Sequence, residues 1–223
     1  MKKDFVTITD FSSEEIQSIL GLAVDLKEEW RVKGNRPIFE GQVLGMVFQK
    51  PSLRTRVSFD MAMRHCGGDA LYLSPSEIGL GKRESIADVA RVLSGYVQIL
   101  MARVFDHAHI LELAKWSSIS VINGLSDYNH PCQAMADALT IMEKKGRFKG
   151  LNVAYVGDGN NVAVSLMYVL TKMGANFTIA TPKEYELPEI TVNIAHEIAK
   201  TSASKLKFIN DPNEAVKLSL IHI

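Results

Sequence analysis

Residues 50–59 read KPSLRTRVSF and place two hydroxyl side chains and two arginines within one short stretch. The stretch lies between an apolar run at residues 43–48, which predicts a strand, and a run at residues 57–66, which predicts a helix. Backbone N–H groups at a helix N-terminus lack partners within the helix, and the helix dipole adds positive potential there. Ser52 and Thr55 can donate hydrogen bonds, and arginine forks suit phosphate and carboxylate groups. The pattern indicates an anion site, although a capped surface helix with solvated arginines would carry the same residues.

Arg103 is a second candidate, because it ends the apolar run of residues 97–102. An arginine at the carboxyl end of a buried parallel strand is well placed to reach a ligand, and the alternative is a surface salt bridge. His107 and His109 follow in the next loop and could chelate a metal. Since the sequence offers no third ligand beside them, we expect solvated loop histidines and no metal site.

The third candidate is the tetrapeptide from His130 to Gln133, where a predicted loop enters a helix. Pro131 suits the first turn of a helix. His130 could donate to a developing oxyanion, and the Gln133 amide could both donate and accept. A histidine at the helix start with a structural glutamine is the alternative. For Cys132 we expect a buried small residue and not a nucleophile, because no activating base lies near it in the sequence.

Gly157 and Gly159 imitate the turn of a dinucleotide-binding site. The third small residue of that pattern is missing, and the next strand ends in Thr181 where an acidic residue would bind a ribose. We therefore expect no nucleotide. Asn160 and Asn161 could bind a carboxylate or an amino acid backbone, or could simply stabilise the turn.

Short apolar strands alternate with amphipathic helices, which predicts an α/β fold whose parallel sheets carry helices on both faces. Ligands of such sheets gather beyond the carboxyl ends of the strands. Residues 50–59, Arg103 and residues 123–133 follow the first, third and fourth predicted strands, so we expect them at one edge. The predicted strands are residues 43–48, 70–73, 97–102, 120–122, 151–156, 177–180 and 206–209. The predicted helices are residues 12–33, 54–66, 84–95, 110–116, 131–145 and 188–200, one ending at residue 173 and one beginning at residue 212.

The strand–turn–helix pattern restarts near residue 149, which predicts two doubly wound domains, the second incomplete. The first would comprise residues 1–148 and the partial second residues 149–223. A complete second domain would need more strands and helices than the remaining residues supply. We therefore expect a truncated chain, and we hypothesise that the last six residues, 218–223 (LSLIHI), are not native.

The composition excludes several broad classes. The 223 residues include 25 basic and 25 acidic ones, so there is no general basic field for nucleic acid. The two cysteines, Cys66 and Cys132, do not form a disulfide framework and suit a reducing compartment. The N-terminus lacks the apolar core of a signal peptide, and no run is long enough to span a membrane. We expect a cytoplasmic protein with no nucleic acid and no membrane as a partner.

Together these motifs resemble the aspartate/ornithine carbamoyltransferase family. The resemblance covers nearly the whole chain: Ser-Leu-Arg-Thr-Arg at residues 52–56, then Arg103, then His-Pro-Cys-Gln at residues 130–133, then Gly-Asp-Gly-Asn-Asn at residues 157–161. Several motifs in the family's order make the signal specific. Cys132 and the paired asparagines resemble the ornithine-type members, because aspartate-type members usually have Thr at that position and lack the pair.

The resemblance implies a site for carbamoyl phosphate and ornithine. Arg103, His130 and Thr55 would polarise the carbamoyl carbonyl as the catalytic residues. Gln133 would hold the carbamoyl amide, and Asn161 would bind the α-carboxylate end of the amino acid. The residues implied to bind substrate are Ser52, Leu53 (through its backbone N–H), Arg54, Thr55, Arg103, His130, Gln133 and Asn161.

The implied reaction transfers the carbamoyl group to the side-chain amine of ornithine, giving citrulline and phosphate in arginine metabolism. A neutral amine attacks, a tetrahedral oxyanion forms and phosphate leaves, so positioning and charge stabilisation carry the chemistry. The resemblance implies no metal or organic cofactor, and a homo-oligomer in the full-length form, a trimer or a multiple of it.

The sequence also departs from the family. Members carry an Asp followed by a Ser-Met-Gly loop, a His-Cys-Leu-Pro turn and a final helix, none of which occurs here. We therefore expect this chain to be inactive alone. Putrescine, an acylated ornithine or aspartate remain alternative acceptors. A module that binds carbamoyl phosphate without catalysis is the alternative of another class.

Overall fold

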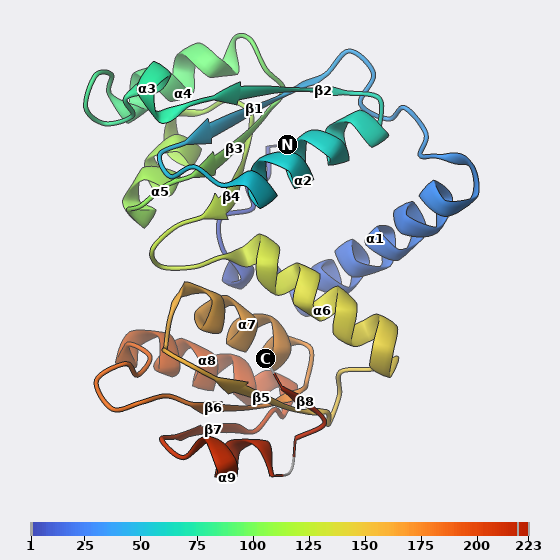
Figure 1. Cartoon of the computed structure of the whole chain (residues 1–223), viewed down its shortest axis with the longest axis vertical. Coiled ribbons are helices and arrows are strands. Elements are labelled where there is room, and N and C mark those ends of the chain that lie inside the picture. Colours follow the sequence, from blue (N-terminus) through green and yellow to red (C-terminus); the bar gives the residue numbers. More distant parts are fainter. Residues whose placement is uncertain (1, 218, 223) are drawn as a thin grey trace. The chain divides into compact units, whose positions relative to one another are not determined.

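The chain folds into two compact units, each with one parallel sheet (Figure 1). Unit 1 takes the N-terminal residues up to Thr7 and then Ala23–Asp127. Unit 2 takes Ile8–Leu22 and the chain from Tyr128 onwards. Each unit has its own core, and each is described by itself below.

The computed structural model describes residues 2–217 and 219–222. The hypothesis that residues 218–223 are not native falls partly outside these residues. The domain boundary expected between residues 148 and 149 divides the chain differently from the two units, and it stays a prediction.

Unit 1 is built on a four-stranded sheet in the order β2-β1-β3-β4 (Figure 1). Helices connect the strands, as parallel pairing requires. The strands are β1 (Val43–Phe48), β2 (Asp69–Leu73), β3 (Ile99–Arg103) and β4 (Ser120–Leu125). The helices are α2 (Leu53–His65), α3 (Pro75–Ile78), α4 (Ile86–Ser94) and α5 (His107–Trp116). The expected strand at residues 43–48 is confirmed at both ends.

The two faces of β1 enter different parts of the core, because successive side chains of a strand point to opposite faces. Met46 and Phe48 pack in a cluster with Met63 of α2. Val47, between them, packs in a second cluster with Val89 of α4 and residues of α5. Helices therefore cover both faces of the sheet, which explains why β1 is apolar without alternation.

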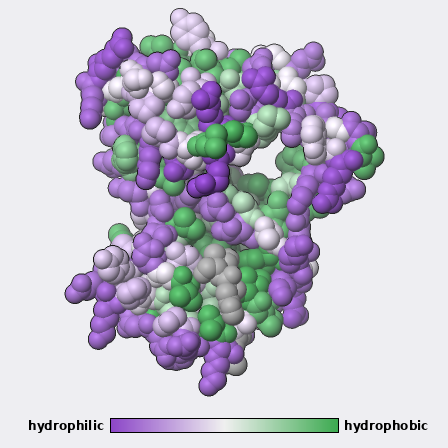
Figure 2. All heavy atoms as spheres, in the orientation of Figure 1, coloured by the Kyte–Doolittle hydropathy of each residue, from purple (hydrophilic) through white to green (hydrophobic). Residues whose placement is uncertain are grey.

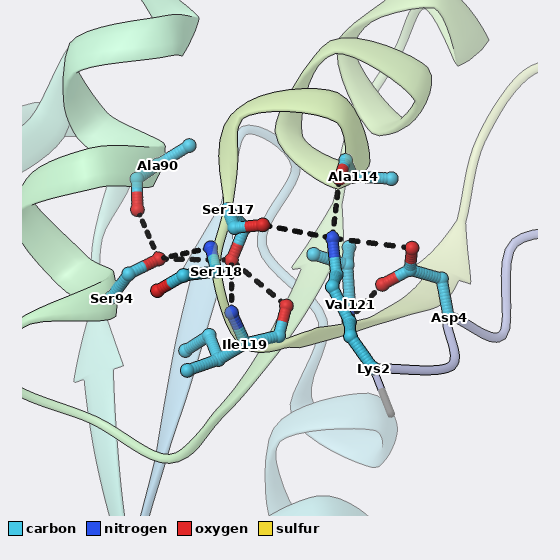
Figure 3. Close-up of polar contacts among 9 residues, drawn as sticks. All are labelled: Lys2, Asp4, Ala90, Ser94, Ala114, Ser117, Ser118, Ile119 and Val121. Atoms are coloured by element: carbon cyan, nitrogen blue, oxygen red, sulfur yellow. Dashed lines mark hydrogen bonds and ion pairs between the residues drawn. The ribbon is translucent and has the colours of Figure 1, made fainter.

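The N-terminal segment of unit 1 is fastened to the end of α5 (Figure 3). Lys2 Nζ donates to the carbonyl oxygens of Ala114 and, at 2.9 Å, Ser117, and it pairs with Asp4 at 3.2 Å. Asp4 in turn accepts from the backbone N–H of Val121 at 2.8 Å. A cation beside the last carbonyl groups of a helix complements the helix dipole.

Unit 2 is built on a second parallel sheet in the order β7-β6-β5-β8 (Figure 1). Helix α7 lies deep in the core of this unit, because its residues 163–171 are all buried. The strands are β5 (Asn152–Val156), β6 (Asn176–Ala180), β7 (Leu206–Ile209) and β8 (Ile221–His222). The helices are η1 (Ile8–Asp10), α6 (Pro131–Lys145), α7 (Asn161–Lys172), α8 (Glu189–Ser202) and α9 (Pro212–Val216). The expected helix at residues 131–145 is confirmed at both ends.

Helix α1 (Ser13–Lys33) contributes to both units. A capping box begins it: the Ser12 N–H donates to Glu15 at 2.9 Å, and the Glu15 N–H donates to Ser12 Oγ at 3.2 Å. Reciprocal bonds of this kind satisfy two N–H groups that the helix leaves unpaired. The start of α1 is thus fixed by its own sequence.

Among the elements that differ from the sequence expectations are α3, α5 and β8. The segment between the strand predicted to end at residue 73 and the helix predicted from residue 84 contains the short helix α3, which begins at Pro75 after a Ser74–Glu77 capping box. Helix α5 begins at His107, earlier than expected, because Asp106 caps it by accepting from the Ala108 N–H at 2.8 Å. Strand β8 was not predicted and pairs in parallel with β5.

The α/β class with parallel sheets is confirmed in both units. Figure 2 shows a mainly hydrophilic surface over α1, whereas apolar groups interrupt the hydrophilic surface of unit 2 on the visible face. Among the described residues, none of the helices combines the length and the apolar character needed to cross a membrane.

Candidate active site

The turn after β1 forms the N-terminus of α2, as the sequence predicts. Ser52 is the N-cap, with an extended backbone (φ −156°, ψ 116°), and its Oγ accepts from the Thr55 N–H at 3.4 Å. Its hydroxyl also donates to Thr55 Oγ1 at 3.1 Å. The first N–H groups of α2 therefore emerge beside Ser52 and Leu53, the geometry that suits an anion.

Sheet order brings Arg103 to this turn. Strands β1 and β3 are neighbours, and Arg103 lies opposite Phe48 in the parallel register. Arg103 Nη1 donates to Thr55 Oγ1 at 3.1 Å. Since Thr55 Oγ1 accepts from both Ser52 and Arg103, its own hydroxyl proton is left to donate to a ligand. The expected proximity of residues 50–59 and Arg103 is thus observed, while their roles stay predictions.

Arg103 carries a charge that no carboxylate among the described residues neutralises. Its Nε is buried and has no hydrogen-bond partner. Burial, and after it the positive charge of Arg54, lower the pKa of Arg103 below its usual value. Within the described part of the chain, no carboxylate pairs with Arg54 or Arg103. Two uncompensated cations at a helix N-terminus favour an anionic ligand with several oxygens.

Two further side chains shape this edge of unit 1. The Arg56 guanidinium stacks over the Tyr72 ring, 4.1 Å from its centroid. Gln49, which the sequence analysis missed, accepts from the Phe105 N–H at 3.1 Å and donates to the Leu80 carbonyl at 3.2 Å. Gln49 thereby joins three loops that are distant in the sequence, and no local pattern could have identified it.

The histidines of the next loop take up structural contacts. His107 Nδ1 lies 2.8 Å from Ser126 Oγ, and His109 Nδ1 lies 3.0 Å from Gln49 Nε2. Solvated loop histidines were expected, so this detail was wrong: both rings are held by neighbouring side chains. In the chain as described, no three His, Cys, Asp or Glu side chains gather into a group that could hold a metal ion.

In unit 2, His130 and Asn161 are linked through one buried serine. The His130 backbone N–H donates to Ser165 Oγ at 2.8 Å, and Ser165 Oγ donates to the Asn161 carbonyl at 3.1 Å. Ser165 is 1% exposed. The start of α6 is therefore tied to the start of α7. Ser165 lies inside an apolar helix and gave no signal in the sequence.

Gln133 lies one turn into α6 and is exposed. Its Nε2 donates to Asp137 Oδ1 at 2.9 Å. Cys132, beside it, has a pKa raised to about 12 by burial, so its thiol stays neutral and is no nucleophile at neutral pH. A buried residue was expected here, but the Cys132 side chain is only partly buried; the raised pKa agrees with the expectation that it is no nucleophile.

The Gly157–Asn161 turn is closed by the protein's own backbone. The Gly159 N–H donates to the Tyr185 carbonyl at 2.6 Å, and a Cβ at Gly159 would lie 2.6 Å from the Leu187 nitrogen. Asn160 Oδ1 accepts from the N–H of Val162 at 2.9 Å, which caps α7. The close approach at Gly159 therefore accommodates the segment around Leu187, where a dinucleotide site would place a pyrophosphate.

Comparison with known proteins gives the same family over both units. The model of the carbamoyl-P binding domain of aspartate/ornithine carbamoyltransferases matches residues 3–143, and that of the Asp/Orn binding domain matches residues 149–219. The chain belongs to the aspartate/ornithine carbamoyltransferase family. The first match includes residues 52–55, Arg103, His130 and Gln133, and the second includes Asn161.

Individual relatives support the assignment. The chain is 51% identical to the ornithine carbamoyltransferase of Pyrococcus abyssi over 96% of its own length and 68% of the relative's. It is 50% identical to that of Bacillus subtilis, over 66% of the relative's length. The structure of the Pyrococcus furiosus ornithine carbamoyltransferase matches with a TM-score of 0.97 at 49% identity, covering 99% of this chain and 70% of that one. The chain thus spans about two-thirds of the length of these family members.

The family's expected site residues are divided between the two units. Ser52, Leu53, Arg54, Thr55 and Arg103 lie in unit 1, where the structure brings Ser52, Thr55 and Arg103 together. His130, Gln133 and Asn161 lie in unit 2, where Ser165 links His130 to Asn161.

Cys132 is expected to resist alkylation in this carbamoyltransferase-family protein. With a pKa of about 12, the thiolate fraction at about pH 8 falls roughly a thousandfold below that of an ordinary cysteine. Because the pKa is raised, reactivity is expected to grow steadily as the pH rises through the alkaline range. Iodoacetamide labelling followed by mass spectrometry measures it, with the unfolded chain as the control. Rapid labelling of Cys132 in the folded protein at neutral pH would contradict the expectation.

Gly159→Ala is expected to lower the free energy of unfolding by about 2–3 kcal/mol, because the new methyl group collides with backbone that cannot move aside cheaply. The colliding atoms are Leu187 N at 2.6 Å and Glu186 C at 2.7 Å. Urea denaturation at unchanged m-value measures the loss. Gly21→Ala is the matched control: nothing lies within 4 Å of the added carbon, so it should be neutral or slightly stabilising within α1. Equal stability of the two variants would show that the close approach at Gly159 is relaxed in solution.

Proposed function

We propose that this protein transfers the carbamoyl group of carbamoyl phosphate to the side-chain amine of ornithine, giving citrulline and phosphate. Arg103, His130 and Thr55 act on the carbamoyl carbonyl, and Gln133 holds the carbamoyl amide. Ser52, Leu53 and Arg54 hold the phosphate, and Asn161 binds the α-carboxylate end of the amino acid. The roles come from the family's motifs, matched residue by residue.

The observation that carries the proposal is the set of contacts and charges around the Arg103 guanidinium. Its Nη1 donates to Thr55, its Nε is buried without a partner, and Arg54 adds a second charge of the same sign. Such an arrangement is costly unless an anion completes it. A phosphate ester that also carries a carbonyl oxygen offers acceptors to the α2 N-terminus, to Arg54, and to the Arg103 and Thr55 donors together.

Ornithine is proposed as the acceptor for three reasons. The second half of the chain matches the Asp/Orn binding domain, and the relatives described above are named ornithine carbamoyltransferases. Cys132 and the Asn160–Asn161 pair also resemble the ornithine-type pattern. Putrescine, an acylated ornithine and aspartate are the competing acceptors, because the Ser-Met-Gly loop that would select among them does not occur in this sequence.

We further propose a cytoplasmic protein that assembles as a homotrimer or a multiple of it. The family resemblance supports the assembly, and Cys66 and Cys132, which form no disulfide in the described part of the chain, are compatible with a reducing compartment. Light scattering after size-exclusion chromatography measures the mass of the assembly in solution.

The test combines calorimetry with a turnover assay. Titration of carbamoyl phosphate into this chain is expected to show saturable binding at one site per chain. Citrulline formation is then followed with ornithine, putrescine, N-acetylornithine and aspartate as acceptors, in this chain and in a version extended to the length of its relatives. Turnover with ornithine supports the proposal, and turnover only with another amine would overturn the choice of acceptor.

Binding without turnover in the extended version would instead favour the second candidate, a carbamoyl-phosphate-binding module. The contacts among Ser52, Thr55 and Arg103 within unit 1 are the observation that favours this candidate, since binding there needs no amino acid site. Absence of carbamoyl phosphate binding in both versions would refute both functions.

A further inference from the structure

The Gln133 amide has two chemically different ends, and the substrate needs one of them. A carbamoyl group presents a carbonyl oxygen, which accepts hydrogen bonds, and an NH2 group, which donates them. Arg103 and Thr55 can only supply donors in their observed arrangement, because Arg has no acceptor and both acceptor positions of the Thr55 hydroxyl are used. The carbamoyl NH2 therefore needs an acceptor from another residue.

Asp137 determines which end of Gln133 is available. Asp137 follows Gln133 by one helical turn on α6, and its Oδ1 accepts from Gln133 Nε2 at 2.9 Å. An ionised carboxylate accepts hydrogen bonds and cannot donate them, so it must face the NH2 end of the amide. The opposite end, Oε1, is then directed away from Asp137. The carboxylate thus fixes the orientation of the Gln133 amide, whereas an unrestrained glutamine could present either its oxygen or its NH2 group.

The surroundings of Asp137 favour its hydrogen bond with the Gln133 amide. Asp137 is half-buried, while Gln133 is exposed. Burial raises the pKa of Asp137, and the hydrogen bond from Gln133 opposes that rise. Of the cations in the part of the chain that the structure describes, none forms an ion pair with Asp137. The contact with Gln133 is the bond that accounts for a partly desolvated carboxylate at this position.

We propose that Asp137 is a positioning residue, which holds the Gln133 amide so that Oε1 accepts a hydrogen bond from the carbamoyl NH2 group. The inference rests on the proposed binding of carbamoyl phosphate. It predicts selectivity for carbamoyl phosphate over acetyl phosphate, which has a methyl group where carbamoyl phosphate has NH2. A glutamine that turned freely would present either end and discriminate less.

The test compares carbamoyl phosphate with acetyl phosphate by calorimetry. Asp137→Ala is expected to weaken carbamoyl phosphate binding by about tenfold, the effect of one hydrogen bond, and to change acetyl phosphate binding by less than about twofold. Asp137→Asn should behave similarly, because an asparagine can face either end of the glutamine. Glu197→Ala, which removes the exposed ion pair with Lys200 on α8, is the matched control and should change neither affinity.

A double-mutant cycle separates positioning from a merely structural role. In a Gln133→Ala background, Asp137→Ala should add less than about a twofold effect, because its action passes through Gln133. Equal weakening of both ligands by Asp137→Ala, or a full additional effect in the Gln133→Ala background, would overturn the inference. Failure of the unmodified protein to bind carbamoyl phosphate would refute the proposed function itself, and that result is read before any variant is compared.

Discussion

Arg103→Ala is expected to lower citrulline formation by about a hundredfold or more, which corresponds to roughly 3–4 kcal/mol of lost transition-state stabilisation. Arg103 is the side chain that joins the end of β3 to Thr55, and its buried Nε has no hydrogen-bond partner among the described residues. Removing it deletes a charge at the point where an oxyanion would develop. It also leaves the Thr55 hydroxyl with one fewer donor to orient it.

The variant should affect both binding and turnover, since the guanidinium would contact the ground state and the transition state. Calorimetry with carbamoyl phosphate and a steady-state citrulline assay in the chain extended to its relatives' length measure the two effects. Arg91→Ala is the matched control, because Arg91 is an exposed arginine that stacks over Trp116 at 4.2 Å. Arg103→Lys should recover little, because an ammonium group cannot reproduce the planar fork. If Arg103→Ala turned over at the normal rate, Arg103 would have no part in the chemistry.

His130→Ala is the second variant for which a loss of about a hundredfold or more in turnover is expected, if His130 donates to the developing oxyanion. The substitution leaves the backbone intact, so the His130 N–H can still bond to Ser165 Oγ. The link between the starts of α6 and α7 should therefore persist. Since the stabilisation acts in the transition state, turnover should fall far more than carbamoyl phosphate affinity.

The controls for His130 lie in the same unit. His196→Ala removes a histidine on α8 whose ring lies 5.8 Å from that of Phe208, and it should not alter turnover. Ser165→Ala keeps the imidazole but breaks the bond that fixes its backbone, so a smaller loss of about tenfold is expected. A His130→Ala variant that loses affinity and turnover in equal measure would assign His130 to ground-state binding.

Local signals in the sequence were sufficient to predict the positions of most helices and strands. The strand at residues 43–48 and the helix at residues 131–145 have the predicted ends, because an unbroken apolar run, a proline at the first turn and a glycine after the last turn act within a few residues. The start of α5 was missed although Asp106 is a good cap, since the apolar repeat begins later. Strand β8 was missed because a two-residue strand has no period, and its pairing with β5 is a long-range contact.

The sequence by itself determined the α/β class, the motif residues and, through their order, the carbamoyltransferase family. Only the tertiary structure decided that β3 lies next to β1, so that Arg103 reaches Thr55, and that Ser165 joins His130 to Asn161. It also decided that Gly159 meets the backbone near Leu187. The physical reason is range: capping and periodicity act between residues a turn apart, whereas sheet order, burial and electrostatics depend on which distant segments pack together.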